Sequence, residues 1–198
     1  ADHPVSTVCA GRTDAGVHAS AQVVHFDTRA MRPLRAWVMG VNSLLPADVA
    51  VQWAREVAPD FHARFSARYR RYRYLVLTRA QRSALAAGSA CLERRPLDAP
   101  RMHEAAQCLL GERDFSAFRG AGCQSRTPMR RLERVAVSRA GDLLTIEVEA
   151  NAFLLHMVRN IAGSLLAVGT GERPPQWLAG VLESRDRTLA GATAPAQG

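Results

Sequence analysis

The stretch RRLERVAVSRAGDLLTIEVEA, residues 130–150, consists of two arms in which apolar and polar side chains alternate. Between the arms lies the short segment AGD, residues 140–142, which contains a glycine. Successive side chains of a β-strand point to opposite faces, so an alternating pattern gives each arm one apolar and one polar face. Two such arms joined by a turn sequence are typical of a β-hairpin. The stretch therefore predicts two neighbouring antiparallel strands.

Helical patterns follow the hairpin. The segment LLHMVRNIAGSLLAV, residues 154–168, is apolar on nearly every side, which predicts a helix that packs on more than one face and ends at Gly169 or Gly171. The segment PPQWLAGVLES, residues 174–184, begins on prolines and is amphipathic, which predicts a second, shorter helix.

The first half of the chain mixes strand and helix signals. Four segments carry the pattern of a strand: VSTVCA (5–10), SAQVVHFDT (20–28), DVAVQWAREV (48–57) and YRYLVLT (72–78). Two segments carry helical spacing: residues 34–45, which follow Pro33, and residues 99–110, for which Asp98 is the predicted N-cap. Strands and helices in this order predict an α+β fold with a mixed, largely antiparallel central sheet flanked by helices.

Composition excludes several classes of protein. With 198 residues, 47% of them apolar, the chain can bury a hydrophobic core. It has no run of about 18 apolar residues that would cross a membrane, and its first residues lack the zones of a signal peptide. Its four cysteines form no CxxC pair and show no zinc-site spacing, which indicates reduced thiols. We therefore expect a cytoplasmic protein that does not bind a membrane.

The charge of the chain favours a polyanionic partner. Its 26 basic residues, all of them arginine, outnumber 18 acidic residues and give a net charge of +8. Residues 64–82 hold seven arginines and no acid, and Tyr69, Tyr72 and Tyr74 are interleaved with them. Cations beside aromatic rings suit the phosphates and unstacked bases of RNA. The alternative is a solvated strand edge whose tyrosines belong to the core.

A dense group of loop-forming and chemically reactive residues lies in GRTDAGVH, residues 11–18. Glycine permits a ligand to approach the backbone closely, and Asp14 offers a carboxylate; the alternative for Asp14 is a turn residue or N-cap. A metal site made from His18, His25 and Asp27 lacks the helical histidine spacing of hydrolytic zinc motifs. We therefore predict no metal ion.

The longer string GRTDAGVHA, residues 11–19, resembles the signature around the catalytic aspartate of the A-type family of tRNA pseudouridine synthases. Further segments that resemble this family follow in the same order: QVVHFDT, GVNSLLP, FHARFSA, RRYRY, DFSAF, CQSRTP and NAFLLHMVRNIAGSLL. The resemblance spans residues 8–190. It implies the pseudouridine synthase fold, an isomerase that converts uridine to pseudouridine in the anticodon stem-loop of tRNA, and a homodimer with a basic cleft for tRNA. It also implies that no metal or organic cofactor takes part.

The resemblance assigns roles to four residues. It makes Asp14 the nucleophile and Arg159 its partner. It makes Tyr72 the aromatic residue that packs on the target base, and Arg12 a residue that helps to expel this base from its stack. The chemistry agrees, because a carboxylate can hold an intermediate covalently while the N-glycosidic bond breaks and uracil rotates. Attack at ribose C1′, assisted loss of the C2′ proton and addition to uracil C6 all stay open.

The surroundings of Arg159 point to an anionic partner independently of the resemblance. Arg159 lies within the predicted helix among apolar residues, and a buried guanidinium needs an anion. The alternative is that its side chain extends to the surface beside His156 and Asn160. We expect a forked hydrogen bond between Arg159 and the carboxylate of Asp14, although the two residues are far apart in the sequence.

Two other functions are consistent with parts of the pattern. A catalytically inactive tRNA-binding module would share the basic surface but would not need Asp14 together with Arg159. A hydrolase that cleaves a nucleoside or glycosidic bond would normally need a second carboxylate or a metal ion near the first, and GRTDAGVH offers one acid.

The resemblance also bears on how the chain is organised. Family members open with a strand, a tryptophan-containing loop and a helix, and they close with a further strand, so both ends are expected to be truncated. We therefore expect residues 1–95 to form the N-terminal part of the catalytic domain, truncated at its start and carrying the Asp14 loop. Residues 96–198 are expected to form its C-terminal part, without the final strand.

Overall fold

The computed structural model describes residues 1–198, which form two compact units. Unit 1 comprises residues 1–12 and 21–67, and unit 2 comprises residues 13–20 and 68–198. The segment Thr13–Ser20, which contains Asp14, therefore belongs to unit 2 although both of its flanks belong to unit 1. The predicted division of the catalytic domain into residues 1–95 and 96–198 stays a prediction.

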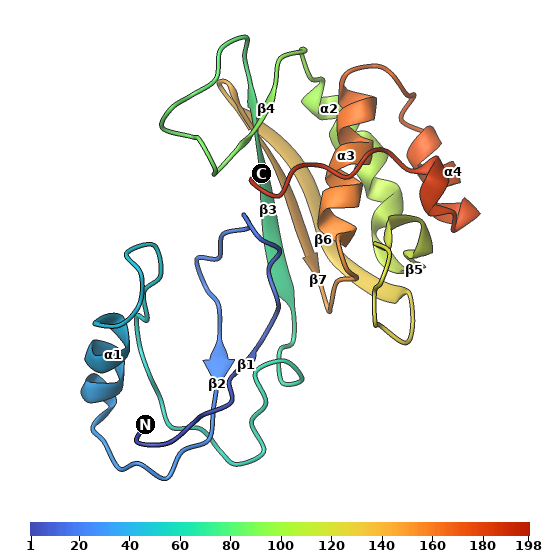
Figure 1. The fold of residues 1–198 in the computed structure, drawn as a ribbon. Coiled ribbons are helices and arrows are strands. Elements are labelled where there is room, and N and C mark those ends of the chain that lie inside the picture. Colours follow the sequence, from blue (N-terminus) through green and yellow to red (C-terminus); the bar gives the residue numbers. More distant parts are fainter. The chain divides into compact units, whose positions relative to one another are not determined.

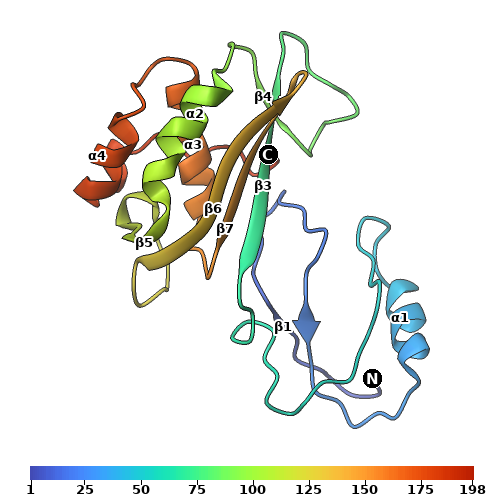
Figure 2. The ribbon, with the colours of Figure 1, turned by 180° about the vertical axis from the view of Figure 1, so that it is seen from behind.

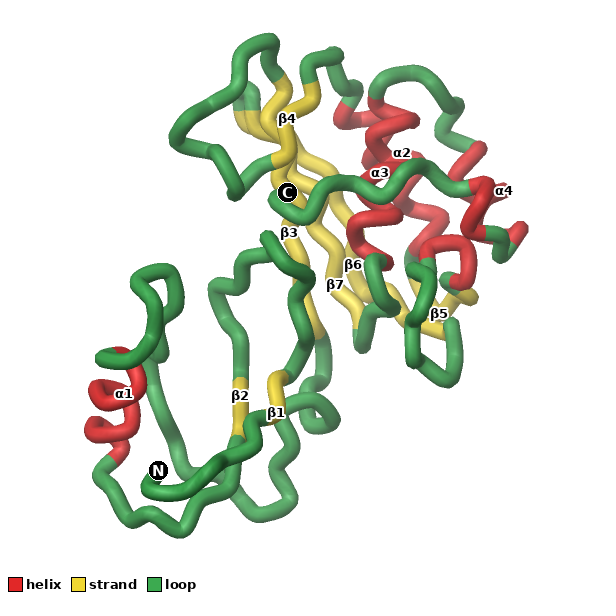
Figure 3. The backbone as a smooth tube through the Cα atoms, viewed as in Figure 1, coloured by secondary structure: helices red, strands yellow, loops and turns green.

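Unit 1 consists mainly of loops (Figure 3). Strands β1 (Val8–Cys9) and β2 (Val24–His25) form an antiparallel pair, so the predicted strands at 5–10 and 20–28 exist but are only two residues long each. Helix α1 (Leu34–Asn42) begins after Pro33, which confirms the predicted helix. Ala63 is the one buried apolar residue of this unit.

The strand predicted at residues 48–57 is wrong, because this segment has no strand partner. Instead of a neighbouring strand, the side chain of Asn42 bonds to the backbone of this segment. Its Nδ2 donates to the carbonyl oxygen of Val51 over 2.8 Å, and its Oδ1 accepts from the Val51 N–H over 2.7 Å. One amide side chain can bond to the backbone N–H and C=O of only one residue. The segment therefore has no ladder of strand-to-strand hydrogen bonds, although its apolar residues alternate as in a strand.

Unit 2 is built around a five-stranded sheet in the order β4-β3-β7-β6-β5. Its strands are β3 (Arg70–Thr78), β4 (Cys91–Glu93), β5 (Gly111–Asp114), β6 (Met129–Ala140) and β7 (Leu143–Ala150). Only β3 and β4 run parallel, and all other neighbours are antiparallel. The hairpin predicted at residues 130–150 is confirmed as β6 and β7, and the mixed, largely antiparallel sheet confirms the predicted fold class.

The helices of unit 2 cover one face of this sheet (Figures 1 and 2). They are α2 (Ala99–Ala106), α3 (Met157–Gly169) and α4 (Trp177–Ser184), with short 3-10 turns at Gln107–Leu109, Ser116–Phe118 and Arg187–Leu189. All three α-helices confirm predictions. The predicted cap of α2 is also present, because the Asp98 side chain accepts a hydrogen bond from the Arg101 N–H over 3.0 Å.

The main core lies between the sheet and these helices. Along β7 the buried side chains alternate with partly exposed ones, as the hairpin pattern predicts; the buried set is Leu144, Ile146, Val148 and Ala150. Helix α3 contributes the fully buried side chains of Ile161, Leu165 and Val168. The opposite sheet face carries no helix. Burial of one apolar face fixes the strand register, and the register determines which side chains of β3 lie beside α3.

Two further findings concern the predictions from composition. None of the helices has the length and apolar character that a membrane crossing requires. All four cysteines carry free thiols.

Candidate active site

Asp14 occupies the first position of a tight turn. The N–H of Val17 donates to the carbonyl oxygen of Asp14 over 3.0 Å, and Gly16, the third residue of the turn, has a φ of +87°. A turn with a positive φ at this position favours glycine. The ring of His18 anchors the end of the turn, since its Nε2 lies 2.7 Å from the carbonyl oxygen of Gly88. These contacts fix the backbone that follows the Asp14 carboxylate in the chain.

The carboxylate of Asp14 forms an ion pair with Arg159 of helix α3. The Arg159 Nη1 donates to Asp14 Oδ2 over 2.7 Å, and the side chains are 21% and 29% exposed, respectively. The predicted contact between these distant residues is therefore present, and Arg159 does not extend to the surface away from an anion. The pair is shielded but still reachable from solvent.

The predicted fork between the two side chains is wrong. Only Nη1 of Arg159 bonds to the carboxylate, and the Arg159 Nε donates instead to the carbonyl oxygen of Ala194 over 2.8 Å. A guanidinium carries five N–H groups, so it can bond to a carboxylate and to a backbone carbonyl at the same time. The backbone of residue 194 therefore takes part in orienting Arg159.

His156 is a second cation-forming group at Asp14, and the sequence analysis missed this role. Its Nε2 lies 3.4 Å from the same Asp14 Oδ2 that Arg159 contacts. Its backbone adopts the left-handed conformation, with a φ of +58°, at the position just before α3. Such a φ is uncommon for a residue other than glycine and is often found at functional sites. Arg159 and His156 both approach Oδ2, so Oδ1 is the carboxylate oxygen that bonds to neither of them.

The loop of residues 119–128 supports the segment that carries His156. The N–H of Gly120 donates to the Leu155 carbonyl oxygen over 2.8 Å, and the Leu155 N–H donates to the Cys123 Sγ over 3.4 Å. Burial would raise the pKa of the Cys123 thiol, but N–H donation from Leu155 and Ser125 and the Arg119 guanidinium outweigh burial and lower this pKa. Cys123 thus connects this loop to Leu155, the residue before His156.

Tyr72 lies on the sheet face that the helices cover. Its neighbours two and four residues along β3, Tyr74 and Val76, are buried on that face, while Tyr72 itself is half-buried. The Tyr72 ring meets the ring of Phe153 edge-on, with centroids 5.0 Å apart. Tyr72 thus presents a partly accessible ring at the edge of the core, which is compatible with both a stacking role and a core role.

The arginines of β3 divide between the two sheet faces. Arg71 and Arg73 point away from the helices and pair with Glu149 and Glu147 of β7 over 2.6 and 2.8 Å. Arg70 alternates to the face of Tyr72, where its Nη1 donates to the carbonyl oxygen of Asn151 over 3.0 Å. The predicted basic surface is therefore partly neutralised by acids that are distant in sequence.

Arg12, the fourth predicted site residue, is the last residue of the first segment of unit 1, two positions before Asp14 in the chain. It belongs to a different unit from Asp14, so its role stays a prediction. No group of three His, Cys, Asp or Glu side chains is arranged to hold a metal ion.

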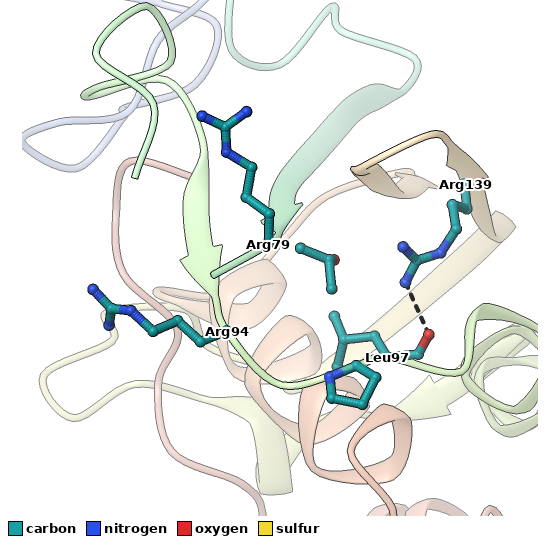
Figure 4. Close-up of a pocket in the computed structure, with 6 residues that line it drawn as sticks. Arg79, Arg94, Leu97 and Arg139 are labelled. Carbon is teal, nitrogen blue, oxygen red and sulfur yellow. Dashed lines mark hydrogen bonds between the residues drawn. The ribbon is translucent and has the colours of Figure 1, made fainter. Parts of the chain in front are cut away.

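A separate pocket of about 450 Å³ opens beside the end of β3, away from Asp14 and Arg159. Its walls are formed by Thr78, Arg79, Arg94, Pro96, Leu97 and Arg139. Figure 4 shows that the three arginine side chains point in different directions, and Arg139 is engaged with the Leu97 carbonyl oxygen over 2.8 Å. The donors do not converge on one point, so we do not treat this pocket as the functional site.

Comparison with known proteins identifies the family of the chain. A family model described as tRNA pseudouridine synthase matches residues 2–66 and 105–198. The chain belongs to the tRNA pseudouridine synthase family. It is 58% identical over all 198 residues to the tRNA pseudouridine synthase A of Xanthomonas euvesicatoria pv. vesicatoria (strain 85-10), of whose length it covers 77%. It is 54% identical over the same span to the tRNA pseudouridine synthase A of Tolumonas auensis, of whose length it covers 76%. Pseudouridine synthases are isomerases, so family membership also confirms the predicted class of enzyme.

Proposed function

We propose that the protein isomerises uridine to pseudouridine in the anticodon stem-loop of tRNA, with Asp14 as the nucleophile. The observation that carries this proposal is the Asp14 carboxylate, which a tight turn presents and Arg159 holds over 2.7 Å. The relatives are named for tRNA and for this reaction, which supports the substrate class. The choice of the anticodon stem-loop rests on the resemblance of the sequence motifs.

The proposed reaction conserves all atoms of the substrate. The bond between ribose C1′ and uracil N1 breaks, the uracil rotates, and C1′ bonds to uracil C5, which loses its proton while N1 gains one. A carboxylate can hold one of the separated parts covalently during the rotation. Oδ1 of Asp14 is the oxygen that makes the attack in this proposal, because Oδ2 is engaged by Arg159 and His156. Attack at C1′, assisted formation of a glycal and addition to uracil C6 remain alternative courses.

Tyr72 and Arg12 have substrate-binding roles in this proposal. A uridine inside the anticodon arm must leave its stack to reach Asp14, and base flipping is the route. The half-buried ring of Tyr72 would pack on the extruded uracil, and Arg12 would help to expel it. The paired rings of Tyr72 and Phe153 support an aromatic platform at this place.

The proposed assembly is a cytoplasmic homodimer, and the reaction uses neither a metal ion nor an organic cofactor. One feature supports association with a further protein surface: unit 1 exposes many large apolar side chains. They include Phe26, Met31, Met39, Leu44, Trp53 and Phe65. Exposed apolar side chains in such number are typical of surfaces that another polypeptide covers.

Release of tritium from tRNA labelled at uridine C5 tests the proposal, because C5 loses its proton only when the new bond forms. The wild type is expected to release tritium in a single-turnover reaction, and Asp14→Asn is expected to release none while it still binds tRNA in a filter assay. Asp48→Asn, at an exposed position in unit 1, is the matched control and should retain the wild-type rate.

Three outcomes would contradict the proposed function. Tritium release by Asp14→Asn at the wild-type rate would remove Asp14 from the chemistry. Binding of tRNA by the wild type without any tritium release would favour an inactive binding module instead. Appearance of free uracil would indicate hydrolysis, which the single carboxylate of the site does not favour.

A further inference from the structure

The segment Arg187–Ala194 lies directly against helix α3, and two glycines make this approach possible. A Cβ atom on Gly163 would lie 1.7 Å from the carbonyl oxygen of Ala192, and one on Gly191 would lie 2.8 Å from the backbone of Ser164. The Gly191 N–H also donates to the Ser164 hydroxyl over 2.9 Å. Contacts this close require the absence of both side chains. The segment is thus held at backbone distance along the helix that carries Arg159.

Three side chains connect this segment to α3, and we call them the polar clamp: Asn160, Arg187 and Thr193. Asn160 is fully buried, and its Oδ1 accepts from the Thr193 hydroxyl over 2.7 Å and from Arg187 Nη2 over 3.0 Å. Arg187 Nη2 also donates to the Thr193 hydroxyl over 2.9 Å. The Asn160 Nδ2 donates to the Phe118 carbonyl oxygen over 2.8 Å. Each member of the clamp therefore bonds to both of the others.

The polar clamp ends one residue from the backbone group that orients Arg159. Thr193 precedes Ala194, whose N–H donates to the Arg159 carbonyl oxygen over 3.1 Å and whose own carbonyl oxygen accepts from Arg159 Nε over 2.8 Å. Asn160 follows Arg159 in α3. The guanidinium is thus fixed at Nε by residue 194 and meets Asp14 with Nη1. Side chains with many rotatable bonds need such second contacts to hold a single geometry.

We propose that Asn160, Arg187 and Thr193 are positioning residues: they fix the carbonyl of Ala194, which in turn orients the Arg159 guanidinium on Asp14. None of the hydrogen bonds of the clamp goes to Asp14, so its effect passes through Arg159. Its catalytic consequence rests on the proposed function, whereas its effect on the geometry of Arg159 does not.

Thr193 is the best residue to change, because its side chain is exposed and the core does not depend on it. Thr193→Val keeps the shape of the side chain and removes the hydroxyl, and Thr193→Ser keeps the hydroxyl. Thr188→Val is the matched control, because it removes a hydroxyl bonded to Asp186 in the same segment but outside the clamp.

Hydrogen exchange at Arg159 Nε, followed by NMR on the 15N-labelled chain, tests the geometry without any assay of activity. Thr193→Val is expected to speed this exchange about tenfold, the effect of weakening one hydrogen bond. Thr193→Ser and Thr188→Val should exchange at the wild-type rate. An unchanged exchange rate in Thr193→Val would overturn the proposal. Equal acceleration in Thr188→Val would also overturn it, because the clamp would then contribute only to the general stability of the segment.

Single-turnover pseudouridine formation at saturating tRNA tests the catalytic consequence. Thr193→Val should lower the rate about tenfold with unchanged tRNA affinity, and Thr193→Ser should restore it. In an Arg159→Lys background, which lacks Nε, Thr193→Val should have no further effect; a second tenfold loss there would overturn the route through Arg159. If the wild type forms no pseudouridine, the proposed function fails, while the exchange experiment still decides the clamp.

Discussion

Arg159 and Asp14 meet through one nitrogen and one oxygen, Nη1 and Oδ2, 2.7 Å apart, across 145 positions of sequence. The geometry is that of a single charge-assisted hydrogen bond, and the Arg159 Nε is committed to the backbone of Ala194. The partner of the carboxylate is therefore oriented by the backbone of Ala194 as well as by the carboxylate itself. Arg159 would then hold its position in the proposed reaction, in which Asp14 forms and breaks a bond to the substrate.

The first prediction separates the charge of Arg159 from its geometry. Arg159→Lys keeps a positive charge but cannot bond to Ala194 and Asp14 in the same way, and we expect the single-turnover rate to fall about 10- to 100-fold with near-normal tRNA affinity. Arg159→Met should lower the rate further and reduce the free energy of unfolding by only about 1–2 kcal/mol, because water still reaches the Asp14 carboxylate. Rates come from tritium release and stability from urea unfolding. A wild-type rate in Arg159→Met would show that the ion pair is structural.

The second prediction concerns the ring of Tyr72. Tyr72→Phe keeps the face that would stack on uracil, so tRNA binding should stay near normal while turnover slows if the hydroxyl takes part in proton transfer. Tyr72→Leu removes the stacking face and should weaken binding by about 1–3 kcal/mol and abolish most turnover. Filter binding and tritium release measure the two effects. Full activity in Tyr72→Leu would place this ring in the core beside Phe153 without a role in recognition.

Long helices and strands with a strong pattern were predictable from the sequence. Short strands, and a segment whose backbone bonds to a side chain instead of a strand, were not. The hairpin of β6 and β7 and the helix α3 are confirmed because their periodicity extends over many residues. Strands β4 and β5, with three and four residues, carry too little pattern to be recognised. The segment 48–57 has the pattern of a strand, but the Asn42 side chain occupies the backbone groups of Val51.

In the candidate site, too, features marked by a sequence motif were predictable, and contacts that depend on the tertiary fold were not. Asp14 and Arg159 were found through motifs, and burial of a guanidinium in an apolar helix predicted an anion near Arg159. The contacts of Nε with Ala194 and of His156 with Asp14 depend on a close backbone approach and on a left-handed residue. Neither feature leaves a repeating pattern in the sequence. The positive φ of a non-glycine residue becomes visible only in the structure.

The third prediction tests the support behind His156. A Cβ atom on Gly120 would lie 2.9 Å from the Leu155 carbonyl oxygen and 3.0 Å from His156 Nδ1, so Gly120→Ala must displace this segment. We expect a loss of about 1–3 kcal/mol in the free energy of unfolding and a lower single-turnover rate. Gly180→Ala is the control, because nothing lies within 4 Å of a Cβ atom there and alanine favours helix α4. Equal activities in the two variants would show that the position of His156 does not matter for the reaction.

The fourth prediction concerns pH and Glu147. The hydrogen bond from Arg73 outweighs desolvation and, with the charges of Arg134 and Arg71, lowers the pKa of the Glu147 carboxyl below its usual value. A carboxyl group whose pKa is lower in the folded state than in the unfolded state stabilises the fold. This stabilisation is fully present above the unfolded-state pKa of about 4.3, and it is lost as the pH falls through the folded-state pKa. Glu147→Gln should therefore be less stable than the wild type at pH 7 and lose less stability on acidification.

Urea unfolding midpoints measured between neutral and strongly acidic pH check this prediction. Glu133→Gln is the matched control, because Glu133 pairs with Arg131 at a more exposed position of the same sheet. The difference between wild type and Glu147→Gln should shrink as the pH falls below about 4.3. A difference that stays constant over the whole range would assign the effect to packing instead of charge.

The last prediction concerns the route of tRNA across β3. Of the arginines on this strand, Arg71 and Arg73 face away from the helices and already neutralise Glu149 and Glu147. A phosphate would have to displace a carboxylate to reach them. Arg70 shares the face of Tyr72, and its Nη1 donates to the carbonyl oxygen of Asn151, so a phosphate near the proposed target base would meet Arg70 before Arg71 or Arg73. We expect Arg70→Gln to weaken tRNA binding and to reduce the slope of log K against log salt by about 0.7–0.9.

The double variant Arg71→Gln/Arg73→Gln serves as the comparison for the same salt series. It removes two charges from the same strand but leaves the face of Tyr72 unchanged, so its slope should stay close to that of the wild type. The Arg→Gln changes leave Glu147 and Glu149 with fewer partners, and a modest loss of stability is therefore expected in the double variant alone. A larger loss of slope in the double variant than in Arg70→Gln would mean that tRNA crosses the helix-free face of the sheet, away from Tyr72.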